Sequence, residues 1–254
     1  MKILVCIKQV PDPDSRFRPN AGGVWFDEAD IAWRMNEYDE YAVEQALRLK
    51  EQLEGVPEVI ALSVGPERVL DAVRKAMAMG CDAGVHIHDT EASTKEPRQI
   101  AGFIAACAKR EEYDLIFTGV QSQDRGSAQT GVLVAELLGF PCVTAILDFA
   151  YDSGTITVRR ELEGGLRGVV RLRSPALFTC QTGLNIPRYP TLPNILKANK
   201  KEIKTIPVSD LPTVEPLTIS TGFYPPAGEG SAIVLEGELS SLADRVVEIL
   251  LAKR

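Results

Sequence analysis

The fold of this chain is decided by residues 114–139, which read DLIFTGVQSQDRGSAQTGVLVAELLG. The short apolar run at residues 115–117 predicts a strand, and Gly119 ends it. A polar loop follows, and residues 128–138 predict a helix. The first N–H groups of a helix lack intrahelical partners, and the helix dipole places partial positive charge there. A phosphate group is therefore a natural ligand of this strand-loop-helix unit.

The loop of this unit is open to two interpretations. Gly126 allows a phosphate to approach the backbone closely, and the hydroxyl groups of Ser127 and Thr130 are further donors. Alternatively, the unit is an ordinary strand-to-helix turn in which Asp124 or Ser127 is the helix N-cap. The local pattern does not decide between the two.

The composition excludes several classes of protein. With 254 residues, 45% apolar and 25% charged, the chain resembles an ordinary globular protein. Its net charge of -7 provides no basic field for nucleic acid or an anionic membrane surface. The five cysteines are scattered without a CxxC pair, which favours reduced thiols in a reducing compartment. No apolar run has the length of a signal-peptide core or a membrane span, so we expect a cytoplasmic protein without membrane insertion.

Short apolar runs alternate with segments of helical period up to about residue 147. Strands are predicted at residues 3–7, 59–64, 85–88, 115–118 and 142–147, and helices at residues 37–53, 67–79, 97–109 and 128–138. This alternation predicts an α/β fold with a doubly wound, mainly parallel, Rossmann-like sheet covered on both faces. Ligands bind beyond the carboxyl ends of such strands, so the loops after Ile7, Val64 and Thr118 are expected to line one pocket.

The pattern changes after residue 147. Residues 155–162 and 166–173 alternate on either side of a Glu-Gly-Gly hairpin signal, and with residues 176–180 they predict an antiparallel addition. Residues 187–226 hold eight of the sixteen prolines, which excludes a continuous helix or a central strand and predicts an extended arm. Residues 240–253 predict an amphipathic terminal helix.

Seven strings follow one another in a fixed order. They are ILVCIKQVP (3–11), MNEYDEYAVE (35–44), SVGP (63–66), AMG (78–80), GVQ through QTG (119–131), RELEGG (160–165) and NIPRYPTLPNI (185–195). In this order and spacing they resemble the β subunits of the electron transfer flavoproteins. The resemblance implies an adenine nucleotide α-hydrolase-like form of the Rossmann-like sheet. It divides the chain into a nucleotide-binding domain over residues 1–185 and a partner-recognition loop with the C-terminal arm over residues 186–254.

The resemblance also implies a function. Such a β subunit forms a heterodimer with an α subunit, which binds most of a redox-active FAD, while the β subunit holds a buried AMP. The pair takes electrons from flavin dehydrogenases, such as acyl-CoA dehydrogenases, and passes them to a membrane electron transfer flavoprotein:quinone oxidoreductase. The chain is then an electron carrier subunit and not an enzyme, which agrees with a sequence that shows no acid, base or nucleophile in a catalytic arrangement.

Carried over by position, the resemblance assigns AMP contacts to Cys6, Asn36, Glu37, Tyr38, Asp39, Val64, Gly119, Val120, Gln121, Ser122, Gln123, Asp124, Arg125, Gly126, Ser127, Ala128, Gln129 and Thr130. Backbone near Cys6 and Val64 would flank the adenine, and Asn36 would bond to a base edge or the ribose. Many relatives have acidic residues at the positions of Arg125 and Gly126 and a proline at that of Glu37. Arg125 would contact the phosphate or point to solvent.

A second segment resembles the recognition loop of the family. In it Leu192 would enter a pocket on the partner dehydrogenase, helped by Pro193 and Ile195 and flanked by Lys197, Lys200 and Lys201. A rigid loop framed by prolines loses little entropy on docking. The alternative is a proline-rich connector in which Leu192 packs on its own domain.

Two other functions compete with this one. Electron-bifurcating members of the family bind a second FAD in place of AMP, and their loop usually reads DGDTAQVGP where this chain reads DRGSAQTGV at residues 124–132. A stand-alone enzyme that hydrolyses ATP is disfavoured, because no P-loop or SGGxDS string is present.

Two further residue pairs are candidates for metal binding or flavin stacking. His86 and His88 share a strand face but are too few for a metal site, so we expect partly exposed histidines. Trp25 and Trp33 are expected to be packing anchors or partner contacts and not flavin stackers.

Overall fold

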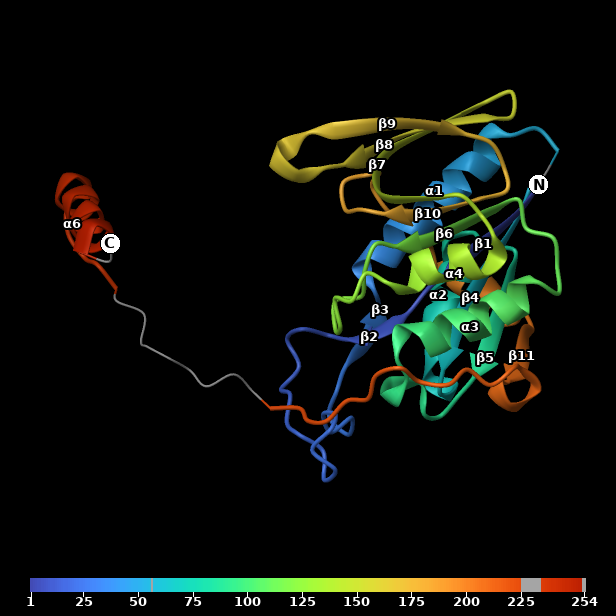
Figure 1. Ribbon diagram of the computed structural model, residues 1–254, viewed down its shortest axis with the longest axis horizontal. Helices are drawn as coiled ribbons and strands as arrows, with labels where there is room; N and C mark the ends of the chain where they lie inside the picture. The colour runs from blue at the N-terminus through green and yellow to red at the C-terminus, as the bar shows by residue number, and fades with distance from the viewer. Residues whose placement is uncertain (56, 225–233, 253–254) are drawn as a thin grey trace. The chain divides into compact units, whose positions relative to one another are not determined.

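The structure is a computed structural model that describes residues 1–55, 57–224 and 234–252 (Figure 1). The chain divides into two compact units, Met1–Phe223 and Tyr224–Arg254. Residues 186–223, which include the expected recognition loop, fall in the first of these units.

A nine-stranded sheet forms the first unit, in the order β11-β5-β4-β1-β6-β10-β7-β8-β9. Its strands are β1 (Lys2–Cys6), β4 (Glu58–Gly65), β5 (Ala83–His88), β6 (Leu115–Gly119), β7 (Cys142–Asp152), β8 (Thr155–Glu161), β9 (Arg167–Leu172), β10 (Ala176–Cys180) and β11 (Ile203–Pro207). All neighbours from β11 to β7 pair in parallel, whereas β7 pairs with β8 and β8 with β9 in antiparallel fashion. The predicted mainly parallel α/β sheet with an antiparallel hairpin is confirmed.

The assignment of residues 176–180 to the antiparallel addition was wrong. These residues form β10, which lies between β6 and β7 and is parallel to both. All five of its residues are buried, whereas the exposed and half-buried residues of β9 alternate. A fully buried apolar run is typical of a strand covered on both faces.

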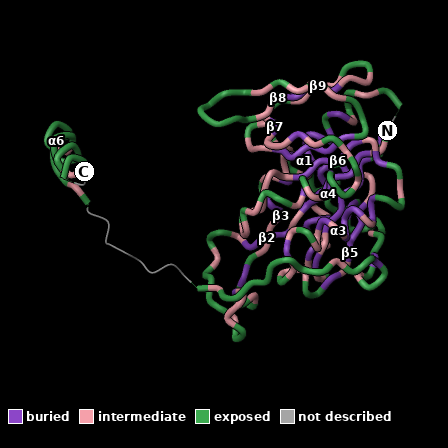
Figure 2. Tube along the Cα trace, viewed as in Figure 1, coloured by how far each residue is buried: buried purple, intermediate pink, exposed green. Residues whose placement is uncertain are grey.

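Helices cover both faces of the sheet, because successive side chains of a strand point to opposite sides. Ile3 and Val5 pack in one buried cluster with α1 (Glu37–Gln52) and α2 (Leu70–Met79). Leu4 and Cys6 pack in the other with α3 (Pro97–Ala108) and α4 (Thr130–Leu138). Figure 2 shows the buried residues concentrated along the central strands and the helices that cover them. A separate two-stranded antiparallel sheet joins β2 (Gln9–Pro11) to β3 (Trp33–Met35).

The proline-rich segment is less extended than the sequence predicted. It contains the short helix α5 (Leu192–Ala198) and then β11, which pairs with β5 at the edge of the sheet. The expectation that these prolines exclude a central strand holds for β11, which ends at Pro207. Pro225 and Pro226, at the end of the expected arm, lie outside the described residues.

In the second unit, α6 (Leu239–Ala252) confirms the expected terminal helix, and Lys253 lies outside the described residues. None of the residues of α6 is buried. Across the described ranges, no helix combines the length and the apolar character that a membrane span requires.

The interpretation of His86 as a partly exposed histidine was wrong. Its side chain is buried, and its Nε2 atom lies 2.8 Å from the carbonyl oxygen of Gly65. This contact joins β5 to the end of β4, so His86 has a structural partner within the sheet.

Candidate functional site

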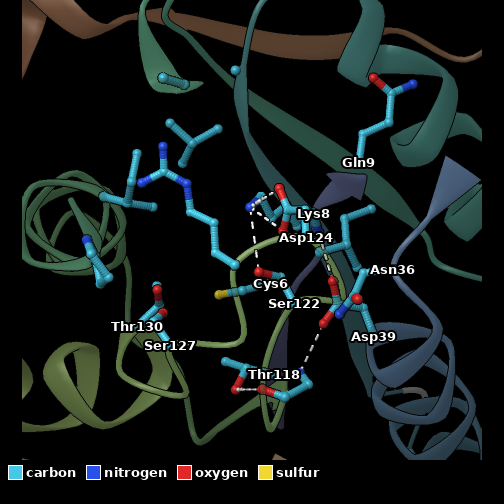
Figure 3. A pocket seen from close by; sticks show the side chains of 18 of the residues that line it. Cys6, Lys8, Gln9, Asn36, Asp39, Thr118, Ser122, Asp124, Ser127 and Thr130 are labelled. Atoms are coloured by element: carbon cyan, nitrogen blue, oxygen red, sulfur yellow. Dashed lines mark hydrogen bonds and ion pairs between the residues drawn. The ribbon is translucent and has the colours of Figure 1, made fainter. Parts of the chain in front are cut away.

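A cleft lies at the carboxyl ends of β1, β4 and β6 and encloses about 1130 Å³ of empty space, part of it open to solvent. The loops after these strands line it together, as a parallel sheet of this kind leads one to expect. The first turn of α4 contributes to the lining (Figure 3), as do α3 with the turn before it and the segment that carries Trp25 and Trp33.

The structure brings most of the predicted nucleotide contacts to this cleft. Those that line it are Cys6, Asn36, Asp39, Val64, Gly119, Val120, Gln121, Ser122, Asp124, Arg125, Ser127, Ala128, Gln129 and Thr130. Glu37, Tyr38, Gln123 and Gly126 are not part of the lining. Of these four, Glu37 accepts a hydrogen bond of 3.0 Å from the Gln123 side chain, and the Tyr38 hydroxyl accepts one of 3.3 Å from Gln121. These two contacts join the start of α1 to the loop between β6 and α4.

Helix α4 starts two residues later than the sequence predicted. Its first residue is Thr130 and its N-cap is Gln129, whose side chain makes no capping hydrogen bond. Neither Asp124 nor Ser127 is the cap, so the interpretation as an ordinary capped turn was wrong. Ala128 has a φ of 53°, which keeps it outside the helix. No side chain caps this first turn, and its residues Thr130 and Gly131 line the cleft, so its N–H groups are available as donors for an anion.

Asp39 ties the strand ends under the cleft to α1. Its carboxylate accepts hydrogen bonds from the backbone N–H of Lys8 at 2.7 Å and from that of Gly119 at 3.0 Å. Burial raises the pKa of Asp39 to about 7, although these N–H groups oppose the shift. A Cβ on Gly119 would lie 2.3 Å from an oxygen of Asp39, so this contact requires glycine. The ends of β1 and β6 are thus held together by one buried carboxylate.

Asn36 fixes the shape of the β6–α4 loop. Its amide nitrogen donates to the Gln121 carbonyl at 2.9 Å, and its oxygen accepts from the Gln123 N–H at 3.0 Å. Only 1% of Asn36 is exposed. Both ends of the side chain are therefore engaged with the protein, which differs from the expectation that they would meet a base edge.

An ion pair crosses the cleft between two of its loops. Lys8 Nζ lies 2.6 Å from a carboxylate oxygen of Asp124 and 3.4 Å from Ser122 Oγ (Figure 3). Burial lowers the pKa of Lys8, and the neighbouring Asp124 opposes this shift. The Asp124 side chain is 6% exposed, so the pair is largely shielded from water on that side. This contact joins the loop after β1 to the loop after β6.

Arg125 faces the cleft and does not point simply to solvent. Its guanidinium donates to the carbonyl oxygens of Ser93 and Lys95, the latter at 3.2 Å, and lies 4.9 Å from the ring centre of Trp25. Within the described part of the chain no carboxylate pairs with Arg125. Its charge therefore has no ion-pair partner in that part of the chain, and both Arg125 and the first turn of α4 line the cleft.

Sequence reasoning missed part of the lining. Trp33 lies under the guanidinium of Arg68 at 3.4 Å, and Trp25 lies under Arg125, so both tryptophans are cleft walls and not only packing anchors. Lys95 also lines the cleft and pairs with Asp89 at 2.9 Å. No local pattern marks these residues, because they reach the cleft from segments distant in sequence. In the described residues no three or more His, Cys, Asp or Glu side chains are grouped as metal ligands.

The predicted docking residues form an exposed surface on and after α5, which packs against α2. Leu192 is 69% exposed and Ile195 37%, and the side chains of Pro193, Lys197, Lys200 and Lys201 are exposed as well. Leu192 does not pack on its own domain, so the connector interpretation was wrong. Ile186 and Tyr189, at 81% and 93%, add to this apolar surface, which we call the docking segment (residues 186–196).

Comparisons with known proteins agree with this geometry. A sequence model described as the electron transfer flavoprotein domain matches residues 23–211, which is most of the chain. This chain belongs to the β-subunit family of the electron transfer flavoproteins. It is 33% identical to the electron transfer flavoprotein subunit beta of Methylophilus methylotrophus over 98% of both chains. It is 36% identical to that of Bacillus subtilis over 98% of this chain and 97% of the relative.

A relative from a third organism supports the same assignment. The electron transfer flavoprotein subunit beta of Homo sapiens is 40% identical to this chain over 83% of each protein. The electron transfer flavoprotein match spans the cleft residues from Trp25 to Gly131 and the whole docking segment. The sequence resemblance is thereby confirmed at the level of the family.

Proposed function

We propose that this chain is the β subunit of a heterodimeric electron transfer flavoprotein and that its cleft holds AMP. An α subunit binds most of the FAD, and the β subunit carries out no reaction alone. The observation that supports AMP most directly is the uncapped first turn of α4, which opens into a cleft at the carboxyl ends of parallel strands. Arg125 supplies a positive charge in the same cleft without a carboxylate partner among the described residues.

The residues of the cleft fit the parts of a mononucleotide. The N–H groups of the first turn of α4, with the hydroxyl groups of Ser127 and Thr130, would hold the phosphate. The apolar wall near Cys6 and Val64 would take the adenine. Burial raises the pKa of the Cys6 thiol, so this cysteine is a neutral wall and not a nucleophile. Asn36 and Asp39 act indirectly: Asn36 fixes the loop between β6 and α4, and Asp39 fixes the ends of β1 and β6.

The docking segment supports the role of an electron carrier. We propose that Leu192, with Pro193 and Ile195, enters a pocket on a flavin dehydrogenase such as an acyl-CoA dehydrogenase, and that the lysines nearby steer the approach. Electrons then pass through the FAD of the heterodimer to an acceptor of the quinone oxidoreductase type. A small exposed apolar anchor suits a contact that must form and dissociate in each cycle.

A second FAD in the same cleft is the alternative. The lining of the cleft includes Trp25 and Trp33, each paired with an arginine, and such a wall suits a larger aromatic ligand. The residues Ala128 and Gln129 are shared with bifurcating members of the family.

Nucleotide analysis of the purified heterodimer tests the proposal. The chain is co-expressed with the α subunit encoded beside it, and the complex is extracted with acid and analysed by chromatography. One FAD and one AMP per heterodimer are expected. Two FAD molecules without AMP would establish the alternative, and a stable monomer without any nucleotide would refute both.

A further inference from the structure

The docking segment is attached to α1 by a cluster of charged side chains. Glu44 lies in the middle of α1 with its side chain only 4% exposed, and Arg188 lies within the docking segment. Arg188 Nε is 2.8 Å from Glu44 Oε2, and its NH2 group donates to Glu44 Oε1 at 3.2 Å. The backbone N–H of Arg188 donates to the same carboxylate at 3.2 Å. Glu44 therefore accepts hydrogen bonds from both the side chain and the backbone of Arg188.

Other contacts of α1 reinforce this attachment. Glu51, two turns further along, accepts from Arg188 NH1 at 2.5 Å and from NH2 at 3.1 Å. Arg48 bonds Glu44 at 2.9 Å, and the amide of Asn185 donates to the Tyr41 carbonyl at 3.0 Å. The start of the docking segment is thus fixed along one face of α1.

The apolar side chains of the segment receive little support from packing. Ile186, Tyr189 and Leu192 are 81%, 93% and 69% exposed, so burial against their own domain does not determine their direction. The polar contacts with α1 constrain the backbone at Arg188, next to Tyr189, while α5, which begins at Leu192, packs against α2. A guanidinium that is held by two carboxylates in a forked arrangement fixes direction as well as distance.

We propose that Glu44 and Arg188 are positioning residues for the docking segment. They fix the backbone around Arg188 on α1 so that Ile186 and Tyr189, together with Leu192 at the start of α5, are presented to the partner dehydrogenase as one preformed surface. Preforming the surface removes ordering entropy from the docking step. This inference rests on the proposed docking function of the segment.

The charge balance of the cluster favours this role. Burial opposes ionisation of Glu44, yet the hydrogen bonds from Arg188 and Arg48 outweigh it and keep the pKa of Glu44 below its usual value. The bond from Arg188 likewise lowers the pKa of Glu51. The carboxylates of the cluster are therefore ionised at neutral pH, so their ion pairs with Arg188 hold the docking segment at that pH.

Steady-state kinetics of the whole heterodimer test the inference. The assay uses an acyl-CoA dehydrogenase from the same organism that reduces the wild-type heterodimer. Arg188→Met is expected to raise the KM for the heterodimer roughly tenfold with kcat nearly unchanged, since docking and not electron transfer is weakened. Arg188→Lys keeps the charge but not the forked guanidinium, so its KM should lie between those of the wild type and Arg188→Met. Amide exchange of residues 186–192 should become faster in Arg188→Met.

A control on the same helix separates positioning from general stability. Glu40→Gln removes the pair between Glu40 on α1 and Lys75, 2.5 Å apart, and should leave KM unchanged. If Arg188→Met does not assemble, Arg188→Lys provides the same comparison. An unchanged KM in the Arg188 variants, together with a raised KM in Leu192→Ala, would overturn the positioning role alone. An unchanged KM in Leu192→Ala would refute the docking function itself.

Discussion

The cleft and the docking segment are built in opposite ways. In the cleft, buried polar groups such as Asp39 and Asn36 bond inward and fix loops at the ends of strands. In the docking segment, apolar side chains such as Tyr189 and Leu192 stay exposed, and charged side chains hold the backbone beneath them. The first design suits a ligand that remains bound, and the second suits a partner that leaves after each encounter.

Helix α1 serves both regions. Its first turn carries Asp39 toward the cleft, and Glu44, little more than one turn later, faces the docking segment. A rigid helix of 16 residues therefore keeps the two regions in a constant relation while their chemistry stays separate. The changes below should affect one region and spare the other.

Gly119→Ala is expected to have the largest effect, and on the cleft. A Cβ there would lie 2.3 Å from an Asp39 oxygen and 2.7 Å from Tyr38 Cβ, so α1 or β6 must shift. Overpacking of this kind lowers the free energy of unfolding by about 1–3 kcal/mol, and we expect the heterodimer to lose AMP. Urea unfolding and nucleotide extraction measure the two effects.

Gly168→Ala on β9 is the matched control for Gly119→Ala. Its nearest neighbour would be a flexible Leu162 side chain at 3.3 Å, so a small change in stability and full AMP content are expected. If Gly119→Ala behaved like Gly168→Ala, the close contact between Asp39 and β6 would not be needed for nucleotide binding.

Leu192→Ala should affect the docking segment alone. Loss of an anchor contributes about 2 kcal/mol, which corresponds to roughly a thirtyfold rise in KM for the heterodimer in the dehydrogenase assay. The free energy of unfolding should change by less than about 0.5 kcal/mol, since Leu192 is 69% exposed. Leu217→Ala, at a residue 74% exposed outside the docking segment, should leave KM unchanged. Equal effects of the two variants would show that exposed leucines contribute without specificity.

Asp39→Asn should change how stability depends on pH. Burial raises the pKa of Asp39 from 3.8 to about 7 in the folded chain, so the folded state binds the proton more tightly than the unfolded state. This contribution to stability is therefore lost as pH rises from about 4 to 7. Removing the titrating group should reduce that loss by at least about 1 kcal/mol in urea titrations at the two pH values. An identical pH profile would mean that Asp39 titrates normally.

Arg125→Gln should have the smallest effect, again confined to the cleft. It removes a positive charge and the bonds to Ser93 and Lys95, so AMP affinity should fall roughly three- to tenfold, or by about 1 kcal/mol. Titration calorimetry of the nucleotide-depleted heterodimer with AMP measures this affinity. Arg98→Gln, which breaks a 2.7 Å bond to the Glu215 carbonyl outside the cleft, should leave the affinity unchanged. Equal affinity in both variants would leave Arg125 without a role in nucleotide binding.

The position of the cleft could be predicted because it follows from a general rule. Apolar periodicity identified the parallel strands, and ligands lie at their carboxyl ends. The direction of β10 could not be predicted, because it follows a hairpin in sequence and only its pairing between β6 and β7 reveals it. The start of α4 was placed too early because Ala128 favours helices, and its positive φ depends on the loop around it.

The details of the site depended on contacts between distant segments. Arg68, Lys95 and the two tryptophans reach the cleft from separate connections, and no spacing in the sequence unites them. The pair of Glu44 and Arg188 joins residues 144 positions apart. Leu192 became a docking candidate only through the family resemblance, since a proline-rich stretch alone favours a connector.

The central claim is that the first turn of α4 holds a nucleotide independently of the docking segment. AMP titration of nucleotide-depleted heterodimers tests it most directly, with Gly131→Ala compared with Leu192→Ala. A Cβ at Gly131 would lie 2.6 Å from Thr118 Oγ1 and 2.9 Å from Thr179 Cγ2, so it would displace that turn. We predict one AMP bound to the wild type and to Leu192→Ala, and none to Gly131→Ala. Unaltered AMP binding in Gly131→Ala, or no binding in the wild type, would contradict the claim.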